Sequence, residues 1–268
     1  MSPSQISPTA IISKKAELGN NITVGPYSII GDQVTIGDNG IIMHHSVIER
    51  NTRIGENCKI HPFCSIGTEP QDITFKGEDT WVEMGSHNII REFTTINRGT
   101  QKGGQVTSIG NHNYLMVYTH IAHDCQVGNG VIFINGATLA GHVEVEDSVV
   151  IGAFSSVHQF VRIGRNAYIG GYSVVLQDIL PFAKVSQSRD YYNFYGTNSI
   201  GMMRNGISRD FINKIKDMFN IIFHSGLNTT QAIEKLKIDF KNSEESLIII
   251  DFIAKTKRGI FKNFKFNV

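Results

Sequence analysis

Four histidines lie in the middle of the chain and offer the side chain that most often acts as a base near neutral pH. A neutral imidazole can take a proton from a hydroxyl that attacks an acyl carbonyl, and an adjacent carboxylate fixes its tautomer. A glycine leaves its backbone N–H uncovered, so that it can stabilise the oxyanion of a tetrahedral intermediate. Residues of these types recur at related spacings: His120, His123, Asp124, Gly141, His142, His158 and Gln159.

A six-residue repeat must position these side chains. An aliphatic residue recurs every six positions from Ile6 to Ile66, from Met84 to Ile96 and from Ile109 to Val175. Neither the period of a strand nor that of a helix explains this pattern. We predict that each unit forms one short strand and a turn, and that three units close a triangular coil of 18 residues, stacked as parallel strands. Residues 18 apart should then share a column, which brings 122–124, 140–142 and 158–160 together.

Two further positions of the repeat carry small residues. Glycine often follows the aliphatic residue, as at Gly25 and Gly152, and we expect it to adopt turn conformations that other residues resist. A small or β-branched residue stands four positions after the aliphatic one, where we expect a crowded corner. Cys58, Cys64 and Cys125 all occupy this position, which predicts buried apolar residues rather than nucleophiles or metal ligands.

The repeat is interrupted near 67–83 and 97–108, which predicts two excursion loops. Long loops on a rigid scaffold often carry function. After Pro181 the spacing becomes helical. We therefore predict a mainly β protein, with a parallel β-helix over 1–185 and a C-terminal α-helical domain over 186–268.

Three helices are expected in the C-terminal part. Ser208 should cap the first, which Gly226 ends. Thr229 or Thr230 should open the second. Ser243 should open the third, with Leu247 facing inward and Gly259 at its end.

The histidine cluster also permits two other interpretations. Three imidazoles that converge on one point bind zinc, as in carbonic anhydrases built on this kind of solenoid. Spacing alone does not separate this site from a general-base site. A solenoid without catalytic activity is disfavoured, because the repeat turns the histidines outward.

Composition excludes several classes of protein. The net charge of +1 gives no global attraction to nucleic acid or to an anionic membrane. No stretch approaches the roughly 18 apolar residues of a membrane helix, so we expect no stable membrane insertion. The N-terminal residues lack a secretory signal pattern, and three cysteines without a C-x-x-C pair fit a reducing compartment. These features predict a cytoplasmic protein.

Several motifs make the chain resemble the UDP-N-acetylglucosamine O-acyltransferases, the family that begins lipid A synthesis in Gram-negative bacteria. The motifs are PQDITFKGE, THIAHDCQVGN, ATLAGHVEVED, SSVHQFVRIG, RNGISRD and KTKRG. The resemblance spans essentially the whole chain. It implies a left-handed coil and a homotrimer with its sites between subunits. It also implies transfer of an (R)-3-hydroxyacyl chain from acyl carrier protein to the 3-hydroxyl of UDP-N-acetylglucosamine by direct attack on the thioester, without a metal or a tightly bound cofactor.

The same resemblance implies a role for each matching residue. His123 is expected to be the general base, Asp124 its partner, and Gly141 the oxyanion donor. The expected substrate-binding residues are Gln71 and Asp72 in the first loop, His120, His142, His158 and Gln159 along the sugar and acyl sites, and Asn198 and Arg204 at the nucleotide end. Gly171 matches the position that limits acyl length, and a side chain there would shorten the groove.

Three positions depart from the family pattern. Thr74 stands where a lysine is common, Ile200 where the best-known member has an acidic residue, and Asn205 where the second arginine of a pair is found. These differences leave room for a modified sugar, such as a 3-amino analogue. The related N-acyltransferase of the same pathway is disfavoured, because it normally carries a separate domain before its repeats, whereas this repeat begins at Ile6.

The last stretch, KTKRGIFKNFKF, carries five cationic residues and no acid: Lys255, Lys257, Arg258, Lys262 and Lys265. A basic segment in solvent is the simpler interpretation. The family resemblance instead implies electrostatic docking of the acidic acyl carrier protein.

Overall fold

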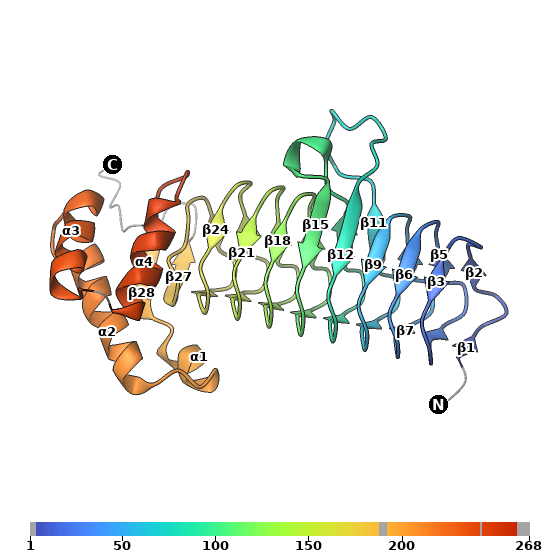
Figure 1. Cartoon of the computed structure of the whole chain (residues 1–268), viewed down its shortest axis with the longest axis horizontal. Coiled ribbons are helices and arrows are strands. Elements are labelled where there is room, and N and C mark those ends of the chain that lie inside the picture. Colours follow the sequence, from blue (N-terminus) through green and yellow to red (C-terminus); the bar gives the residue numbers. More distant parts are fainter. Residues whose placement is uncertain (1–3, 188–191, 242, 262–268) are drawn as a thin grey trace.

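The computed structural model shows a long three-sided prism with helices packed at its C-terminal end (Figure 1). The structure describes residues 4–187, 192–241 and 243–261. Short strands alternate among three sheets, one on each side of the prism, and pair in parallel with the coils before and after. The fold is a left-handed parallel β-helix followed by helices, which confirms the predicted fold class.

Up to Val175, each sheet collects every third strand of the chain, whereas the last two strands both join sheet A and pair antiparallel with each other. Sheet A contains β1 (Gln5–Ile6), β4 (Thr23–Val24), β7 (Ile41–Ile42), β10 (Lys59–Ile60), β13 (Ile89–Ile90), β16 (Tyr114–Leu115), β19 (Ile132–Phe133), β22 (Val150–Ile151), β25 (Tyr168–Ile169), β27 (Ala183–Gln187) and β28 (Tyr192–Thr197). Sheet B contains β2 (Ile11–Ile12), β5 (Ile29–Ile30), β8 (Val47–Ile48), β11 (Ser65–Thr68), β14 (Thr95–Asn97), β17 (His120–Ile121), β20 (Thr138–Leu139), β23 (Ser156–Val157) and β26 (Val174–Val175). Sheet C contains β3 (Glu17–Leu18), β6 (Val34–Ile36), β9 (Thr52–Ile54), β12 (Trp81–Met84), β15 (Val106–Ile109), β18 (Gln126–Val127), β21 (Glu144–Val145) and β24 (Arg162–Ile163).

The strand register confirms that residues 18 apart stack. His120 pairs with Thr138, which pairs with Ser156. The spacing lengthens at two places, where Thr52 pairs with Val82 and Val82 pairs with Thr107. These are the positions of the two excursions. They leave the prism on the same side and lie next to each other (Figure 1).

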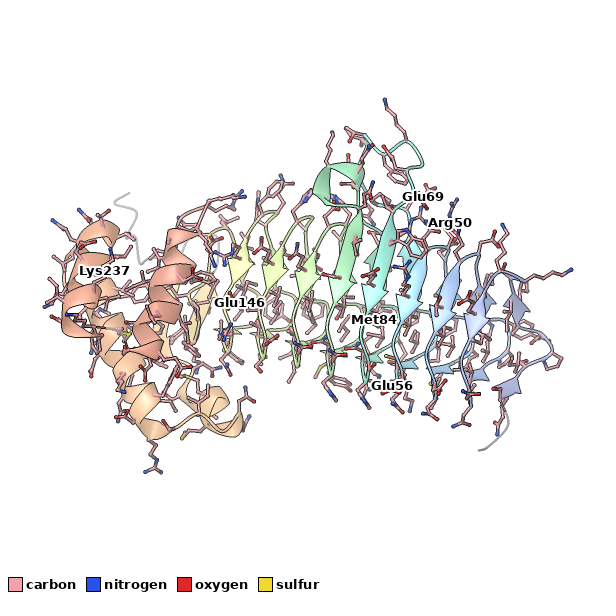
Figure 2. All side chains as sticks on the ribbon, in the orientation of Figure 1. Arg50, Glu56, Glu69, Met84, Glu146 and Lys237 are labelled. Atoms are coloured by element: carbon pink, nitrogen blue, oxygen red, sulfur yellow. The ribbon has the colours of Figure 1, made fainter. Side chains whose placement is uncertain are left out.

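The inward aliphatic residues fill the prism, and charged side chains such as Arg50, Glu56 and Glu146 lie outside it (Figure 2). From Val24 to Val175 the repeat positions are at most 5% exposed. Ile6, in contrast, is 47% exposed. The first coil has no described coil beneath it, so its apolar residues are buried on one side only.

The repeat glycines do not have the conformation that the sequence predicted. The left-handed backbone conformation belongs instead to a residue two positions later, such as Tyr27, with φ 59°. The glycines are required by close packing between coils. A Cβ on Gly25 would lie 2.6 Å from the backbone nitrogen of His44, and one on Gly37 would lie 2.7 Å from that of Glu56. Close backbone approach, rather than turn geometry, therefore selects glycine.

The three cysteines are buried, as predicted, at 0–1% exposure. Burial raises the pKa of the Cys64 and Cys125 thiols to about 12. They are poor nucleophiles, because the thiolate is the reactive form.

Helices cover the C-terminal end of the prism (Figure 1). They are α1 (Ser199–Arg204), α2 (Arg209–Phe219), a π-helical turn η2 (Asn220–His224), α3 (Thr229–Asp239) and α4 (Glu244–Ala254). Phe194 of β28 joins the two parts, because its ring packs against Phe219 and stacks 3.8 Å from the Phe223 ring. The described helices include none long and apolar enough to cross a membrane.

Most helix boundaries agree with the sequence. Ser208 and Ser243 cap α2 and α4, and Thr229 opens α3 behind an Asn228 cap. Two expectations are wrong: α4 ends at Ala254, and Leu247 is 58% exposed. The boundary between the β-helix and the helical domain at residue 185 remains a proposal. Strand β27 spans this position, because it extends from Ala183 to Gln187.

Candidate active site

The predicted site lies where the chain passes from sheet B to sheet C, here named the B/C corner. Asp124, His142 and Phe160 occupy the same turn position in three successive coils, and each has a φ between 61° and 65°. The His142 ring stacks on Phe160 with their centroids 4.5 Å apart. The winding therefore brings residues from three coils into one column, as the repeat predicted.

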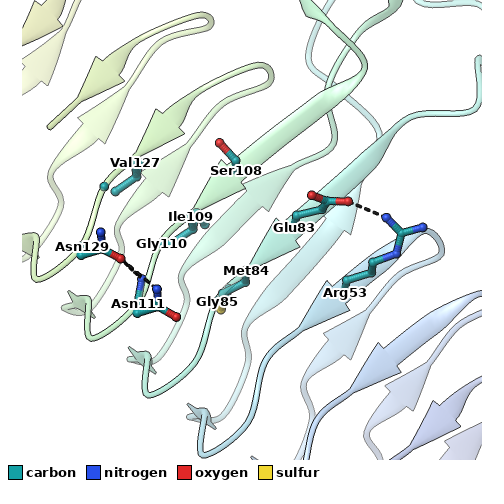
Figure 3. Close-up of a pocket in the computed structure, with 11 residues that line it drawn as sticks. Arg53, Glu83, Met84, Gly85, Ser108, Ile109, Gly110, Asn111, Val127 and Asn129 are labelled. Carbon is teal, nitrogen blue, oxygen red and sulfur yellow. Dashed lines mark hydrogen bonds and ion pairs between the residues drawn. The ribbon is translucent and has the colours of Figure 1, made fainter. Parts of the chain in front are cut away.

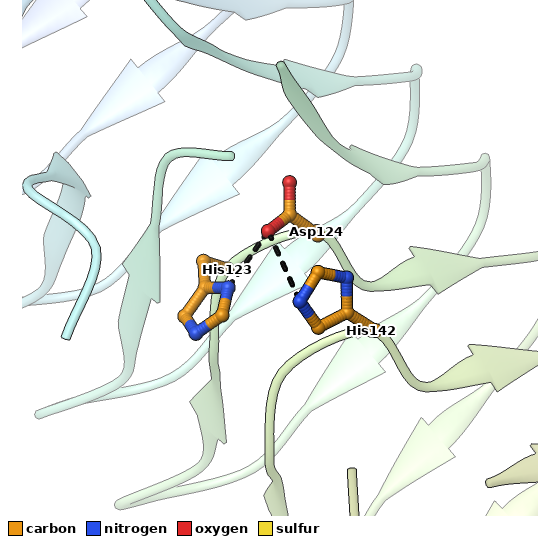
Figure 4. Close-up of side chains that lie close together, drawn as sticks. All are labelled: His123, Asp124 and His142. Carbon is orange, nitrogen blue, oxygen red and sulfur yellow. Dashed lines mark hydrogen bonds and ion pairs between the residues drawn. The ribbon is translucent and has the colours of Figure 1, made fainter. Parts of the chain in front are cut away.

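Asp124 holds the centre of this group (Figure 4). Its Oδ2 lies 2.7 Å from His123 Nδ1 and 3.7 Å from His142 Nε2. Thr100 donates a hydrogen bond to each carboxylate oxygen, one from its backbone N–H and one from its hydroxyl, both at 2.7 Å. Burial alone would raise the pKa of Asp124, but the hydrogen bonds from His123 and Thr100 outweigh it, and the pKa lies below its usual value.

The Asp124 contact fixes the tautomer of His123. A carboxylate at Nδ1 requires a proton on that nitrogen, which leaves Nε2 as an acceptor. The ring lies directly against Gly141, where an added Cβ would be 2.5 Å from His123 Cε1 and 2.8 Å from Nε2. Gly141 thus gives the imidazole its space. Among the described residues, no hydrogen bond occupies the Gly141 N–H.

His120 and His142 flank this pair. His120 Nδ1 lies 2.7 Å from the Thr95 hydroxyl. Burial lowers the pKa of His120, and His123 lowers it further. Burial also lowers the pKa of His142, and this effect outweighs the opposing effect of Asp124. Both imidazoles are therefore neutral near pH 7.

His158 and Gln159 lie on the same corner, one coil further along. His158 is half-buried, and its Nδ1 lies 3.1 Å from the Gln159 carbonyl oxygen. Gln159 is exposed. The structure thus places both at the B/C corner, and no hydrogen bond within the described part of the chain joins either of them to His123.

The first excursion brings Asp72 to the site. The Thr74 backbone N–H and then its hydroxyl lower the pKa of Asp72, and His123 contributes through its charge. The second excursion reaches the first through Lys102 Nζ, 3.2 Å from Thr74 Oγ1. Gln71 is exposed on the same loop.

Three predicted residues lie away from this corner. Asn198 caps α1 and donates to the Asn166 carbonyl oxygen, at the corner between sheets C and A. Arg204 ends α1 and is exposed. Gly171 lies at the corner between sheets A and B, here named the A/B corner, and is exposed. A single chain therefore does not gather all of the predicted site residues.

The zinc interpretation fits this geometry poorly. The described side chains contain one group that could hold a metal, His123, Asp124 and His142. It offers two imidazoles rather than three. The 2.7 Å between His123 Nδ1 and Asp124 Oδ2 is a hydrogen-bond distance, whereas two ligands of one tetrahedral zinc ion lie about 3.3 Å apart.

Comparisons with known proteins agree with the acyl-transfer interpretation. A family profile described as UDP N-acetylglucosamine O-acyltransferase, domain 2, matches residues 178–261, and a bacterial transferase hexapeptide profile matches 142–177. An acyl-[acyl-carrier-protein]–UDP-N-acetylglucosamine O-acyltransferase of Alkalilimnicola ehrlichii is 48% identical over 258 residues, 96% of this chain and 99% of the relative. The relative from Aliarcobacter butzleri is 47% identical, with 97% of this chain and 99% of that protein covered.

Solved structures give the same result. LpxA from Acinetobacter baumannii superposes with a TM-score of 0.91 at 41% identity, covering 95% of this chain and 98% of that one. The Francisella novicida UDP-N-acetylglucosamine acyltransferase gives 0.93 at 35% identity, covering 97% and 94%. This chain belongs to the UDP-N-acetylglucosamine O-acyltransferase family.

Of the three residues that depart from the pattern of this acyltransferase family, Thr74 and Asn205 form hydrogen bonds with neighbouring residues. Thr74 is bonded to Asp72 and Lys102. Asn205 donates to Asn166 Oδ1 at 2.6 Å and ties the end of α1 to the prism. Ile200 is 61% exposed, and nothing in the structure explains it.

A basic hollow opens beside the B/C corner. It has a volume of about 260 Å³ and is lined by His142, Glu144, Phe160, Arg162, Lys255 and Lys257. Arg162 is paired with Glu144, and Lys255 with Asp251. Arg258 donates to the Leu176 carbonyl oxygen, whereas Lys262 and Lys265 lie outside the described residues.

Another hollow, of about 570 Å³, lies on the outer face of sheet C (Figure 3). Four of its polar side chains are paired with one another: Arg53 with Glu83, and Asn111 with Asn129. No imidazole lines it. It therefore lacks the chemistry of the B/C corner.

Sequence reasoning missed the residues that hold Asp124. Thr100 grips the carboxylate, and the Thr107 hydroxyl accepts the Asp124 backbone N–H at 2.8 Å. Thr100 falls within the predicted interruption at 97–108, and this position was the sequence feature that could have pointed to the residue. The repeat gives no register inside an interruption, so the contact could not be derived from spacing.

Proposed function

We propose that this chain transfers an (R)-3-hydroxyacyl group from acyl carrier protein to the 3-hydroxyl of UDP-N-acetylglucosamine, as the first step of lipid A synthesis. The observation that carries the proposal is the arrangement of His123, with Nδ1 on Asp124 and its ring against Gly141. The names of the relatives supply the two substrates.

The proposed reaction uses the free Nε2 of His123. This nitrogen takes the proton of the sugar hydroxyl while the oxygen attacks the thioester carbonyl carbon. The Gly141 N–H donates to the oxyanion of the tetrahedral intermediate. The carbon–sulfur bond then breaks, and the imidazolium returns the proton to the leaving thiolate. Asp124 remains ionised and holds the imidazolium in place, which its lowered pKa favours.

We propose that the site is completed by a second copy of the chain in a homotrimer. The A/B corner supports this, because it exposes a row of aromatic side chains. The Phe63 and Phe93 rings stack 5.2 Å apart, and Phe93 and Tyr118 stack 4.9 Å apart. These three are 42–62% exposed. Neighbouring exposed apolar side chains favour an interaction site.

Acyl carrier protein is the proposed donor, and the basic hollow beside His142 is its proposed docking region. Lys257 is exposed there, and an acidic partner would find positive charge at the mouth of the site. Three buried thiols without a disulfide fit a reducing compartment, so we place the reaction in the cytoplasm.

One assay matrix tests the function. Acyl carrier protein loaded with 3-hydroxyacyl chains of several lengths is offered with UDP-N-acetylglucosamine or with its 3-amino analogue. We expect transfer to UDP-N-acetylglucosamine, and His123→Ala should lower kcat about 10³-fold. His112→Ala, an exposed histidine on another corner, is the matched control and should keep full activity. Retained activity in His123→Ala, or no transfer to UDP-N-acetylglucosamine, would contradict the proposal.

A further inference from the structure

Thr100 lies in the second excursion and holds both oxygens of the Asp124 carboxylate. Its backbone N–H donates to Oδ1 and its hydroxyl to Oδ2, each at 2.7 Å. The residue is 4% exposed, and Asp124 is equally buried. Charge-assisted hydrogen bonds of this length inside a protein are strong and directional.

The local structure holds Thr100 in this position. Thr100 caps the 3-10 turn η1 (Gln101–Gly103), and its carbonyl oxygen accepts the Gln105 N–H at 2.9 Å. The turn lies so close to Asp124 that a Cβ on Gly103 would collide with the carboxylate. The excursion is therefore packed onto the Asp124 side chain, and the hydroxyl has little freedom to turn away.

The shared oxygen links Thr100 to the proposed base. Asp124 Oδ2 accepts both the Thr100 hydroxyl and the Nδ1–H of His123. We infer that Thr100 is a positioning residue for acyl transfer, which aims the Asp124 carboxylate at His123 and thereby sets the direction of the free Nε2. This inference rests on the proposed role of His123 as the base.

No other described residue on the second excursion donates a hydrogen bond to the Asp124 carboxylate as Thr100 does. Thr107 binds the Asp124 backbone N–H, which fixes the main chain and leaves the carboxylate free to rotate. His142 Nε2 is 3.7 Å from Oδ2, beyond hydrogen-bond distance. Without the hydroxyl, His123 would be the remaining side-chain donor to Oδ2.

Loss of the hydroxyl should also change the pH dependence. A carboxylate with fewer donors attracts a neighbouring imidazolium more strongly. The acid limb of kcat/KM should therefore move upward. The other titratable groups around His123 are Asp72, His120 and His142, and a change at Thr100 touches none of them directly.

The test compares Thr100→Val, which removes only the hydroxyl, with Thr100→Ser, which keeps it. We expect Thr100→Val to lower kcat about 10- to 100-fold, with KM for the sugar nucleotide within about twofold of the wild-type value. The acid limb of its kcat/KM profile should move to higher pH. Thr100→Ser should restore most of the rate. Ser28→Ala is the control for loss of a buried hydroxyl, because Ser28 Oγ donates to the Met43 carbonyl oxygen far from the site.

A double-mutant cycle separates this role from general stability. In an Asp124→Asn background, Thr100→Val should have little further effect, because Thr100 acts through the carboxylate. Wild-type kcat and pH profile in Thr100→Val, or a serine variant as slow as the valine variant, would overturn the inference. Full activity in His123→Ala would instead overturn the proposed function, so the two failures are distinguishable.

Discussion

The A/B and B/C corners share one backbone conformation and carry different chemistry. Tyr118 and Asp124 both have a left-handed φ, 63° and 61°, in successive turns of one coil. At the A/B corner this position holds exposed, stacked aromatic rings, whereas at the B/C corner it holds Asp124 and His142 around a buried carboxylate. The coil fixes where the turn side chains stand, and residue type decides the role that we propose for each corner, subunit contact at one and proton transfer at the other.

Substitution of an equivalent glycine at each corner should give the clearest test of this difference between the corners. Gly141 and Gly171 each precede a left-handed residue, on the B/C and A/B corners respectively. Gly141→Ala would push the His123 ring aside, so we expect kcat to fall about 100-fold with the fold intact. The measurement is a steady-state assay together with a thermal melt. Normal kcat in a folded Gly141→Ala protein would show that the imidazole has room to spare.

Gly171→Ala is the corresponding substitution at the A/B corner. Its Cβ would meet the Ala153 carbonyl oxygen at 3.3 Å and no catalytic side chain. We expect activity with short acyl donors to persist and activity with the longest accepted donor to fall about tenfold. An equal loss with every chain length would argue against a role for Gly171 in acyl length.

The aromatic row of the A/B corner should control assembly. Phe93→Ser combined with Tyr118→Ser removes two stacked rings from the proposed subunit contact, and we expect the trimer to dissociate at micromolar concentration. Analytical ultracentrifugation gives the mass. Ile238→Ser, which changes an exposed apolar residue on α3, should leave the mass unchanged. A trimer that survives the double change would place the interface elsewhere.

The smallest expected effect concerns the pH dependence of stability at the B/C corner. The pKa of His120 is lower in the folded protein than in the unfolded chain. The unfolded state therefore binds more protons below about pH 6.5, and stability falls as the pH drops through that range. His120→Gln should make the free energy of unfolding less steep between about pH 5 and 7, as urea titrations would measure. An unchanged slope would show that burial does not hold His120 neutral.

The regular part of this architecture could be predicted from the sequence, because the repeat converts residue number into position. His123, Asp124 and His142 lie close together because residues 18 apart share one column, as the spacing predicted. The glycine interpretation failed, since a sequence pattern does not distinguish a left-handed turn from a close approach between coils. Thr100 and Lys102 could not be placed, because an excursion has no period.

The C-terminal part shows the same limit. Cap residues located α2 and α4, because a hydroxyl at the first turn leaves a local signature. The inward face of α4 was predicted wrongly at Leu247, because all three of Leu247, Ile248 and Ile249 are apolar and only packing against α2 decides which one is buried.

Subunit mixing tests the central claim most directly, namely that the B/C corner of one chain reacts with substrate held by another. His123→Ala and Arg204→Ala chains, each expected to be inactive or nearly so, are unfolded together, refolded and assayed. If the base and the nucleotide contact come from different chains, random assembly in a trimer leaves about a quarter of the sites intact, and about a quarter of wild-type activity should return. Activity no higher than that of the separately refolded variants would contradict a site shared between chains.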